Sequence, residues 1–186
     1  AGVDTTKWEI QTGDGCSYGT CGWGNSELES YQAANATVAN GVLTITAKKQ
    51  RVGSKAYTSA RLRTLNLGGQ WTHGRFEARM KTPKGAGMWP AFWALPANTT
   101  VAWPTSGEID IQESTGQKNM FDWGTIHYGS STSNHQFLST EIYKQPDSWA
   151  DAFHVYAVEW TTDKITWYID DVLYARGQTP PLTTIR

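Results

Sequence analysis

Residues 107–114 read GEIDIQES and place three acids, Glu108, Asp110 and Glu113, close together in one short stretch. Side chains of an extended strand alternate between its two faces, so Glu108 and Asp110 share a face. Strict alternation would put Glu113 on the other face, with the two isoleucines. A β-bulge at Ile111–Gln112 would insert one residue and return Glu113 to the acidic face. We therefore expect a bulged strand whose three acids project to one side.

Such a strand is either a solvated charged face or an active site. Like charges on one face repel one another, and no basic residue lies between positions 107 and 116. Charges do protect sheet edges, but strand-like segments on both sides predict a position inside a sheet. On a flat sheet the two glutamates would stand roughly 13 Å apart, so they can approach only across a concave surface. The pattern favours catalysis.

Period-two alternation of side-chain character recurs along the chain. It occurs in residues 41–50, 74–82, 153–161 and 164–177, the last a hairpin with Asp170-Asp171 near its turn. No segment shows a sustained helical period, and neither an internal repeat nor a low-complexity linker is present. The sequence predicts an all-β fold of two packed antiparallel sheets, a sandwich or jelly roll.

Size and charge exclude several classes of protein. The chain has 186 residues, enough for one domain with a substantial core, and its formal net charge of −1 gives no general attraction to nucleic acid or anionic membranes. No stretch approaches the ~20 apolar residues of a membrane span. No signal peptide is visible, although an exported protein would have lost it on maturation.

The two cysteines, Cys16 and Cys21, lie among glycines in CSYGTC. A zinc site would need further ligands, and the four histidines do not have the spacing of such a site. A local disulfide is favoured over two free thiols, and it indicates export to an oxidising compartment.

Ten tryptophans suggest an aromatic surface for a ligand. Trp89 and Trp93 would share one face of a strand and form a stacking platform beside the acids. Three more are predicted in loops that can line a cleft: Trp71, Trp103 and Trp123. Three others are assigned to core packing: Trp8, Trp160 and Trp167.

The order of GRFEARMKTPKGAGMWPAFWALP, WPTSGEIDIQESTG and GTIHYG resembles glycoside hydrolase family 16, especially its bacterial endo-1,3-β-glucanases, or laminarinases. NSELESY, NGVLTITAKK and DAFHVYAVEWTTDKITWYIDDVLYA also fit, so the resemblance covers nearly the whole chain. The family signature is E-x-D-x-E or its bulged form E-x-D-x-x-E, and Glu108, Asp110 and Glu113 match the bulged form. Mixed-linkage lichenases resemble the unbulged form, whereas laminarinases, agarases and κ-carrageenases resemble the bulged one.

The resemblance implies a jelly roll with a concave cleft and hydrolysis with retention of configuration, with no cofactor required for catalysis. At the matching positions, Glu108 would be the nucleophile, Glu113 the general acid/base, and Asp110 the residue that orients and tunes them. Such a site holds one ionised and one protonated carboxyl, and three crowded acids titrate as a unit. Residues implied to bind substrate are Trp89, Trp93, Trp103, His127, Asn25 and Arg79.

The chain also departs from the family pattern. Family members usually have a further strand before DTTKW and more strands after the hairpin at 164–177. We therefore expect residues 1–186 to form one domain of this family that is incomplete at both ends, with exposed edges that could pair with a complementary chain. The family's structural calcium lies on the convex face. The Gly41 carbonyl matches one ligand, but the acidic ligands expected near the termini are absent.

The preferred interpretation is a secreted, extracellular endo-1,3-β-glucanase whose partner is a polysaccharide. One alternative is a non-catalytic β-glucan-binding protein, which the retention of all three acids disfavours. Others are a retaining hydrolase of mixed-linkage glucan or agarose, and an unrelated lectin-like sandwich with an acidic calcium face. The balanced charge, with no basic cluster near the acids, argues against a sulfated polymer.

Overall fold

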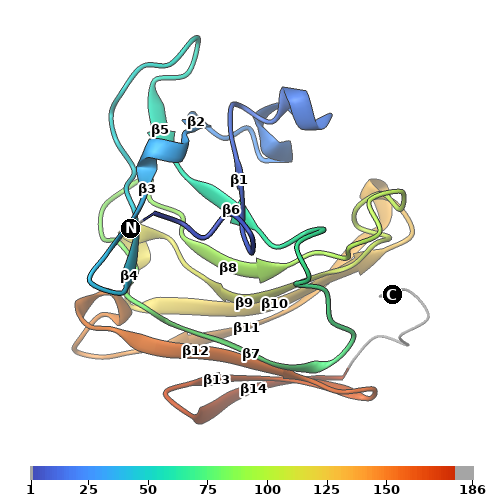
Figure 1. Cartoon of the computed structure of the whole chain (residues 1–186). Helices are drawn as coiled ribbons and strands as arrows, with labels where there is room; N and C mark the ends of the chain where they lie inside the picture. Colours follow the sequence, from blue (N-terminus) through green and yellow to red (C-terminus); the bar gives the residue numbers. More distant parts are fainter. Residues whose placement is uncertain (1, 179–186) are drawn as a thin grey trace. The chain divides into compact units, whose positions relative to one another are not determined.

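The computed structural model describes residues 2–178, and the chain divides into two compact units, Ala1–Gln70 and Trp71–Arg186 (Figure 1). Regular structure in residues 2–178 consists of β-strands and short 3-10 helices. In this range no helix is long and apolar enough to cross a lipid bilayer. The prediction of an all-β fold is confirmed.

The first unit is built from short strands paired two by two. β1 pairs with β6 and β3 with β4 in antiparallel fashion, whereas β2 and β5 run parallel. Its strands are β1 (Glu9–Gln11), β2 (Glu29–Tyr31), β3 (Ala36–Ala39), β4 (Val42–Ile45), β5 (Tyr57–Ser59) and β6 (Arg61–Arg63). Its 3-10 helices are η1 (Cys16–Tyr18), η2 (Cys21–Gly24) and η3 (Ala33–Asn35).

The strand predicted over 41–50 is shorter than expected, since β4 ends at Ile45 and all its residues are exposed. Asn40 and Gly41 join it to β3 with φ angles of 52° and 76°. A two-residue turn of this kind matches the twist of a hairpin, and asparagine and glycine accept left-handed backbone at low cost.

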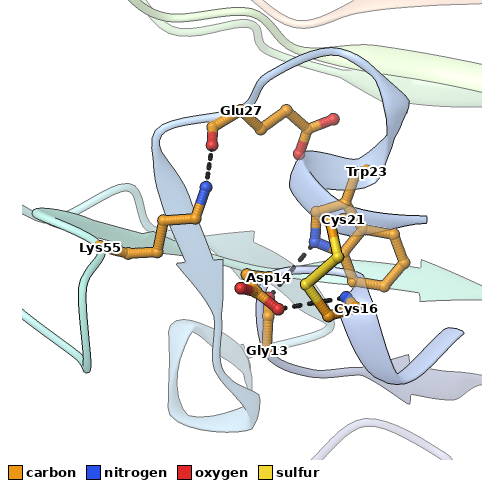
Figure 2. Close-up of a disulfide and its surroundings, with 7 residues drawn as sticks. All are labelled: Gly13, Asp14, Cys16, Cys21, Trp23, Glu27 and Lys55. Carbon is orange, nitrogen blue, oxygen red and sulfur yellow. Dashed lines mark hydrogen bonds between the residues drawn. A yellow bond between two sulfur atoms is a disulfide. The ribbon is translucent and has the colours of Figure 1, made fainter. Parts of the chain in front are cut away.

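The predicted disulfide is confirmed, because Cys16 and Cys21 are bonded (Figure 2). Asp14 Oδ1 accepts a hydrogen bond from the Cys16 amide at 3.1 Å. The buried Trp23 lies beside the bridge, and its indole nitrogen donates to the Gly13 carbonyl at 3.3 Å. The disulfide therefore closes a loop that packs around a buried aromatic ring.

The second unit is a sandwich of two four-stranded antiparallel sheets, with strand orders β11-β10-β9-β8 and β14-β13-β12-β7 (Figure 1). The first sheet contains β8 (Ala91–Ala94), β9 (Glu108–Glu113), β10 (Phe121–Gly129) and β11 (His135–Tyr143). The second contains β7 (Gly74–Met80), β12 (His154–Trp160), β13 (Lys164–Ile169) and β14 (Val172–Gln178). Short 3-10 helices are η4 (Gly116–Lys118), η5 (Thr132–Asn134) and η6 (Trp149–Asp151).

Three of the predicted strand segments coincide with β7, β12 and the β13–β14 hairpin. Asp170 and Asp171 form the hairpin turn, with φ angles of 51° and 62°. Their short polar side chains tolerate this left-handed backbone better than most residues do. The turn predicted from the sequence is therefore confirmed.

The hydrophobic core of the second unit lies between its two sheets. The acidic strand β9 contributes Ile109 and Ile111, and β10 contributes Ile126. The facing sheet contributes Tyr156, Val158, Ile165, Trp167, Ile169 and Ala175. Because side chains alternate along a strand, burying the two isoleucines of β9 turns its acids to the outer face.

Trp167 is the largest side chain of this core that reaches the acidic strand. Its indole Nε1 donates to the main-chain carbonyl of Asp110 at 2.8 Å, which satisfies a buried donor. The ring passes over Gly124, where a Cβ atom would lie 2.5 Å from Trp167 Cδ1. Glycine at this position permits the close approach of the two sheets.

Candidate active site

The strand pairing shows how the three acids come to share a face. In β10, Trp123 and Thr125 are two residues apart, yet their partners in β9 are Glu113 and Asp110, three residues apart. β9 is also one residue longer than β8 over the same stretch. The extra residue lies at Ile111–Gln112, so the predicted bulge is confirmed, and Glu113 returns to the face of Asp110.

The bulge turns two consecutive side chains inward. Ile111 and Gln112 are both buried, with exposed fractions of 3% and 1%. The Gln112 amide donates to Ser114 Oγ at 2.9 Å and to Asp122 Oδ1 at 3.3 Å, which satisfies both of its N–H groups. Burial raises the pKa of Asp122 well above its usual value. This polar cluster supports the irregular strand from inside.

Each of the two glutamates accepts a hydrogen bond from the indole of a tryptophan. Trp89 Nε1 donates to Glu113 Oε1 at 2.5 Å, and Trp103 Nε1 donates to Glu108 Oε2 at 2.6 Å. Trp89 lies just before β8, and Trp103 lies in the loop before β9. The side chains of both are exposed, by 53% and 40%, so their rings also present apolar surface to solvent.

The central acid contacts a histidine of the next strand. His127 is the register partner of Glu108 in β10, and its Nε2 lies 3.1 Å from Asp110 Oδ2. Burial disfavours a charge on His127, but the hydrogen bond to Asp110 and the charges of the three acids outweigh it and raise its pKa. His127 can therefore carry positive charge into the acidic cluster.

The environment shifts the affinity of both glutamates for protons. The pKa of Glu108 is raised to about 7, first by burial and then by the charge of Asp110, against the effects of His127 and Trp103. Burial also raises the pKa of Glu113, although the hydrogen bond from Trp89 lowers it. Carboxyls with raised pKa values hold a proton to higher pH than ordinary glutamates do, and such groups can exchange protons with a reacting group.

A groove of about 360 Å³ runs beside Glu113. Its lining contains neither lysine nor arginine, and consists of Glu113, Thr115, Trp123, Thr125, His127, His135, Phe137 and Ser139. Trp123 was predicted in a loop, but it lies in β10 opposite Glu113. Its ring stacks on Phe121, which in turn packs on Tyr143 of β11. The acids are therefore flanked by aromatic rings at both ends.

His135 is a residue of the site for which no role was predicted from the sequence. Its ring stacks against His127, and its Nε2 lies 2.9 Å from His127 Nδ1. The signal in the sequence was a second histidine just after the Gly129 turn, on a strand that folds back beside His127.

The structure brings together most of the predicted site residues. Trp93 is the register partner of Asp110 in β8, so its side chain lies on the acidic face. Arg79 is not brought there. It lies on the solvent face of β7 in the other sheet, where its guanidinium packs on Phe153 at 4.4 Å. Neighbouring residues on β7 point to the core, and alternation sends Arg79 away from the acids' sheet.

Two predictions fall in the first unit. Asn25 donates to Glu27 Oε1 at 3.3 Å, and its role in sugar binding stays a prediction. Gly41 occupies the exposed β3–β4 turn. In the part of the chain that the structure describes, no group of three or more His, Cys, Asp or Glu side chains could hold a metal ion. We assign no ligand set to the Gly41 carbonyl.

The tryptophans assigned to packing behave in two ways. Trp167 is buried and Trp160 packs against the core, as predicted. Trp8 is 41% exposed and lines a groove of the first unit together with Ile10 and Leu67, so its assignment to the core was wrong.

Comparison with known proteins places the chain in a family. Residues 25–182 match the model of glycosyl hydrolases family 16. The chain belongs to this family. The matched range includes the E-x-D-x-x-E signature at Glu108, Asp110 and Glu113. The resemblance predicted from the sequence is confirmed.

Curated relatives in family 16 include a beta-glucanase of Rhodothermus marinus, 42% identical over 189 residues. Another is a glucan endo-1,3-beta-glucosidase of Cryptopygus antarcticus, 37% identical over 177 residues. They match 97% and 90% of this chain, respectively. The chain spans 62% of the length of each.

A solved family 16 structure has the same fold. The laminarinase catalytic domain of Thermotoga maritima, in complex with cetyltrimethylammonium bromide, superposes with a TM-score of 0.88 at 37% identity. The match covers 98% of this chain and 74% of that one. The predicted jelly roll of antiparallel sheets is confirmed by this likeness.

Proposed function

We propose that this family 16 chain is an endo-1,3-β-glucanase that cleaves laminarin-like glucans with retention of configuration. The observation that carries the proposal is the bulged strand β9, which presents Glu108, Asp110 and Glu113 on one face beside a groove. A non-catalytic glucan-binding protein would have no need for three acids held in mutual repulsion. The family relatives support the choice of substrate.

In the proposed reaction, Glu108 attacks the anomeric carbon and forms a covalent glycosyl-enzyme. Glu113 donates its proton to the departing glycosidic oxygen, so the leaving chain departs as a neutral alcohol. Glu113, now ionised, takes a proton from water, and the resulting nucleophile breaks the ester to Glu108. The glucan product is released, and Glu113 is again protonated.

The environments of the two glutamates bear differently on their proposed roles. Glu113 has a raised pKa, so it stays protonated to higher pH than an ordinary glutamate. Glu108 must be ionised to attack, and burial and the charge of Asp110 oppose this by raising its pKa to about 7. The His127 charge and the Trp103 indole partly offset that rise, so attack by Glu108 is favoured as the pH passes about 7. Asp110 lies between the glutamates and fixes the orientation of His127 through the 3.1 Å contact.

The groove supports a neutral polysaccharide as the substrate. Exposed faces of Trp89 and Trp103 can stack on the C–H faces of sugar rings, and we propose the same role for Trp93. The groove lining has neither lysine nor arginine to pair with sulfate groups. The disulfide between Cys16 and Cys21 supports a secreted, extracellular protein.

The test of the proposed function is a screen of the chain against laminarin, lichenan, agarose and κ-carrageenan. We expect reducing sugar from laminarin, and Glu108→Gln should lower turnover by several orders of magnitude. Glu77→Gln is the matched control, because Glu77 is an exposed glutamate on the other sheet. Proton NMR should show the β-anomer first. Release of the α-anomer first would exclude Glu108 as nucleophile.

A further inference from the structure

His135 connects the two halves of the acidic cluster. Its Nε2 lies 2.9 Å from Nδ1 of His127, whose other nitrogen lies 3.1 Å from Asp110 Oδ2. On another side, the His135 ring packs on Trp103 with a centroid distance of 4.6 Å. Trp103 in turn donates to Glu108. Through these contacts, His135 links Asp110 to Glu108, both on β9.

The backbone fixes the position of His135. Gly129 and His135 are register partners at the turn end of the β10–β11 hairpin. Gly129 has a φ of 143°, and a Cβ atom there would lie 2.3 Å from the Asn134 carbonyl oxygen. Glycine therefore allows the chain to turn tightly and to set the His135 ring directly against His127.

We propose that His135 is a positioning residue for the acidic cluster, which accepts a hydrogen bond from His127 Nδ1–H and so keeps His127 protonated and directed at Asp110. The inference rests on the proposed hydrolase function. A carboxylate nucleophile beside other acids stays ionised more readily when a positive charge is close by. A hydrogen bond to the charged form of His127 stabilises that charge.

The charges around His127 and His135 favour a protonated imidazole at one of them and a neutral imidazole at the other. The groups that face His127 are Glu108, Asp110 and Glu113 from β9 and His135 from β11. Partial burial and the charge of His127 lower the pKa of His135. His135 is thus the acceptor of the pair and His127 the donor.

The test uses variants of His135 in the full chain. His135→Phe keeps a ring against Trp103 but removes the hydrogen-bond acceptor. If the larger ring disturbs folding, His135→Ala is used in place of His135→Phe. His135→Gln keeps an acceptor. His73→Phe is the matched control, because His73 contacts Trp160 on the other sheet and lies outside the cluster.

The first measurement is an NMR titration of the His127 imidazole, which needs no substrate. We expect His135→Phe to lower the titration midpoint by about one pH unit, the size of one charge-assisted hydrogen bond. His135→Gln should restore part of the shift, and His73→Phe should leave the midpoint unchanged. An unchanged midpoint in both the Phe and Ala variants would overturn the proposal.

The second measurement is the pH profile of laminarin hydrolysis. In His135→Phe, His127 should lose its charge at lower pH, and Glu108 then becomes harder to ionise. The acidic limb of the pH–activity profile should therefore move to higher pH. Activity that falls equally at all pH values would mean a merely structural role and would overturn the proposal. If the wild-type chain cleaves no glucan, the proposed function fails, and the NMR titration still decides the role of His135.

Discussion

The buried indole of Trp167 donates to the main-chain carbonyl of Asp110 across 2.8 Å, from one sheet of the second unit to the acidic strand of the other. The bond holds the strand by its backbone and leaves the Asp110 carboxylate free to contact His127. The acids are therefore positioned from the core side, independently of any substrate.

Replacing Gly124 with alanine should disturb this contact. The new methyl group would meet the Trp167 ring, and overpacking of this kind should lower the free energy of unfolding by about 1–3 kcal/mol. Urea denaturation measures the change. Gly2→Ala is the control, since a Cβ atom at Gly2 meets nothing within 4 Å. Equal stability of the two variants would contradict the packing that we describe.

The raised pKa of Glu108 should make stability depend on pH. Its folded value of about 7 lies above the ordinary 4.5, so the folded chain binds the proton more tightly than the unfolded chain does. The stabilisation is complete below about pH 4.5 and is lost as the pH rises through about 7. In the wild type, the unfolding free energy should fall by an amount on the order of 2–3 kcal/mol over this pH range. Glu108→Gln should abolish that fall.

Denaturation of the Glu108→Gln variant at acid and at mildly alkaline pH measures this effect. Glu77→Gln serves again as the control, because the exposed Glu77 should leave the pH dependence of stability as it is in the wild type. The same fall in wild type and in Glu108→Gln would show that Glu108 is not the group responsible.

Trp89 combines a hydrogen bond and an apolar face, and two variants separate them. Trp89→Phe keeps a ring but loses the hydrogen-bond donor to Glu113, so the pKa of Glu113 should rise. The alkaline limb of the pH–activity profile should then move to higher pH. Trp89→Ala should also weaken binding of laminarin oligosaccharides by about 1–3 kcal/mol. Calorimetry and pH profiles distinguish the two effects.

Trp8→Phe is the control for these variants, since Trp8 is a partly exposed tryptophan of the first unit. A loss of stability with unchanged affinity in Trp89→Ala would assign Trp89 to structure alone.

Removing the disulfide should have a moderate effect, because the bonded cysteines are only five residues apart. The double variant Cys16→Ser, Cys21→Ser should lose about 2 kcal/mol of unfolding free energy, from the greater freedom of its unfolded chain. Wild type measured with reductant should match the variant. Under non-reducing conditions, ready alkylation of both thiols in wild type would show that no bond forms.

Alternation along a single strand was enough to predict the shared face of the acids. Two isoleucines had to be buried, and only an inserted residue could keep Glu113 beside Asp110. The same reasoning located the Asp170-Asp171 turn, because a turn between two alternating segments depends on local sequence alone.

Contacts between strands were harder to predict, since alternation gives the faces of a strand but not its register with a neighbour. His135 and Trp123 meet the acidic cluster only through the pairing of β10 with β9 and β11. Arg79 shows the same difficulty, because its strand belongs to the opposite sheet. Trp8 shows that a large aromatic residue need not be buried.

The bulge also governs which changes of length the acidic strand can accept. With Ile111 and Gln112 both turned inward, deletion of Gln112 would leave E-x-D-x-E, a plain alternation that still directs every acid outward. A residue gained or lost between Glu108 and Asp110 would instead exchange the two faces and bury a carboxylate. Two chains can therefore differ by a single residue at this one position and still direct all three acids to the same face.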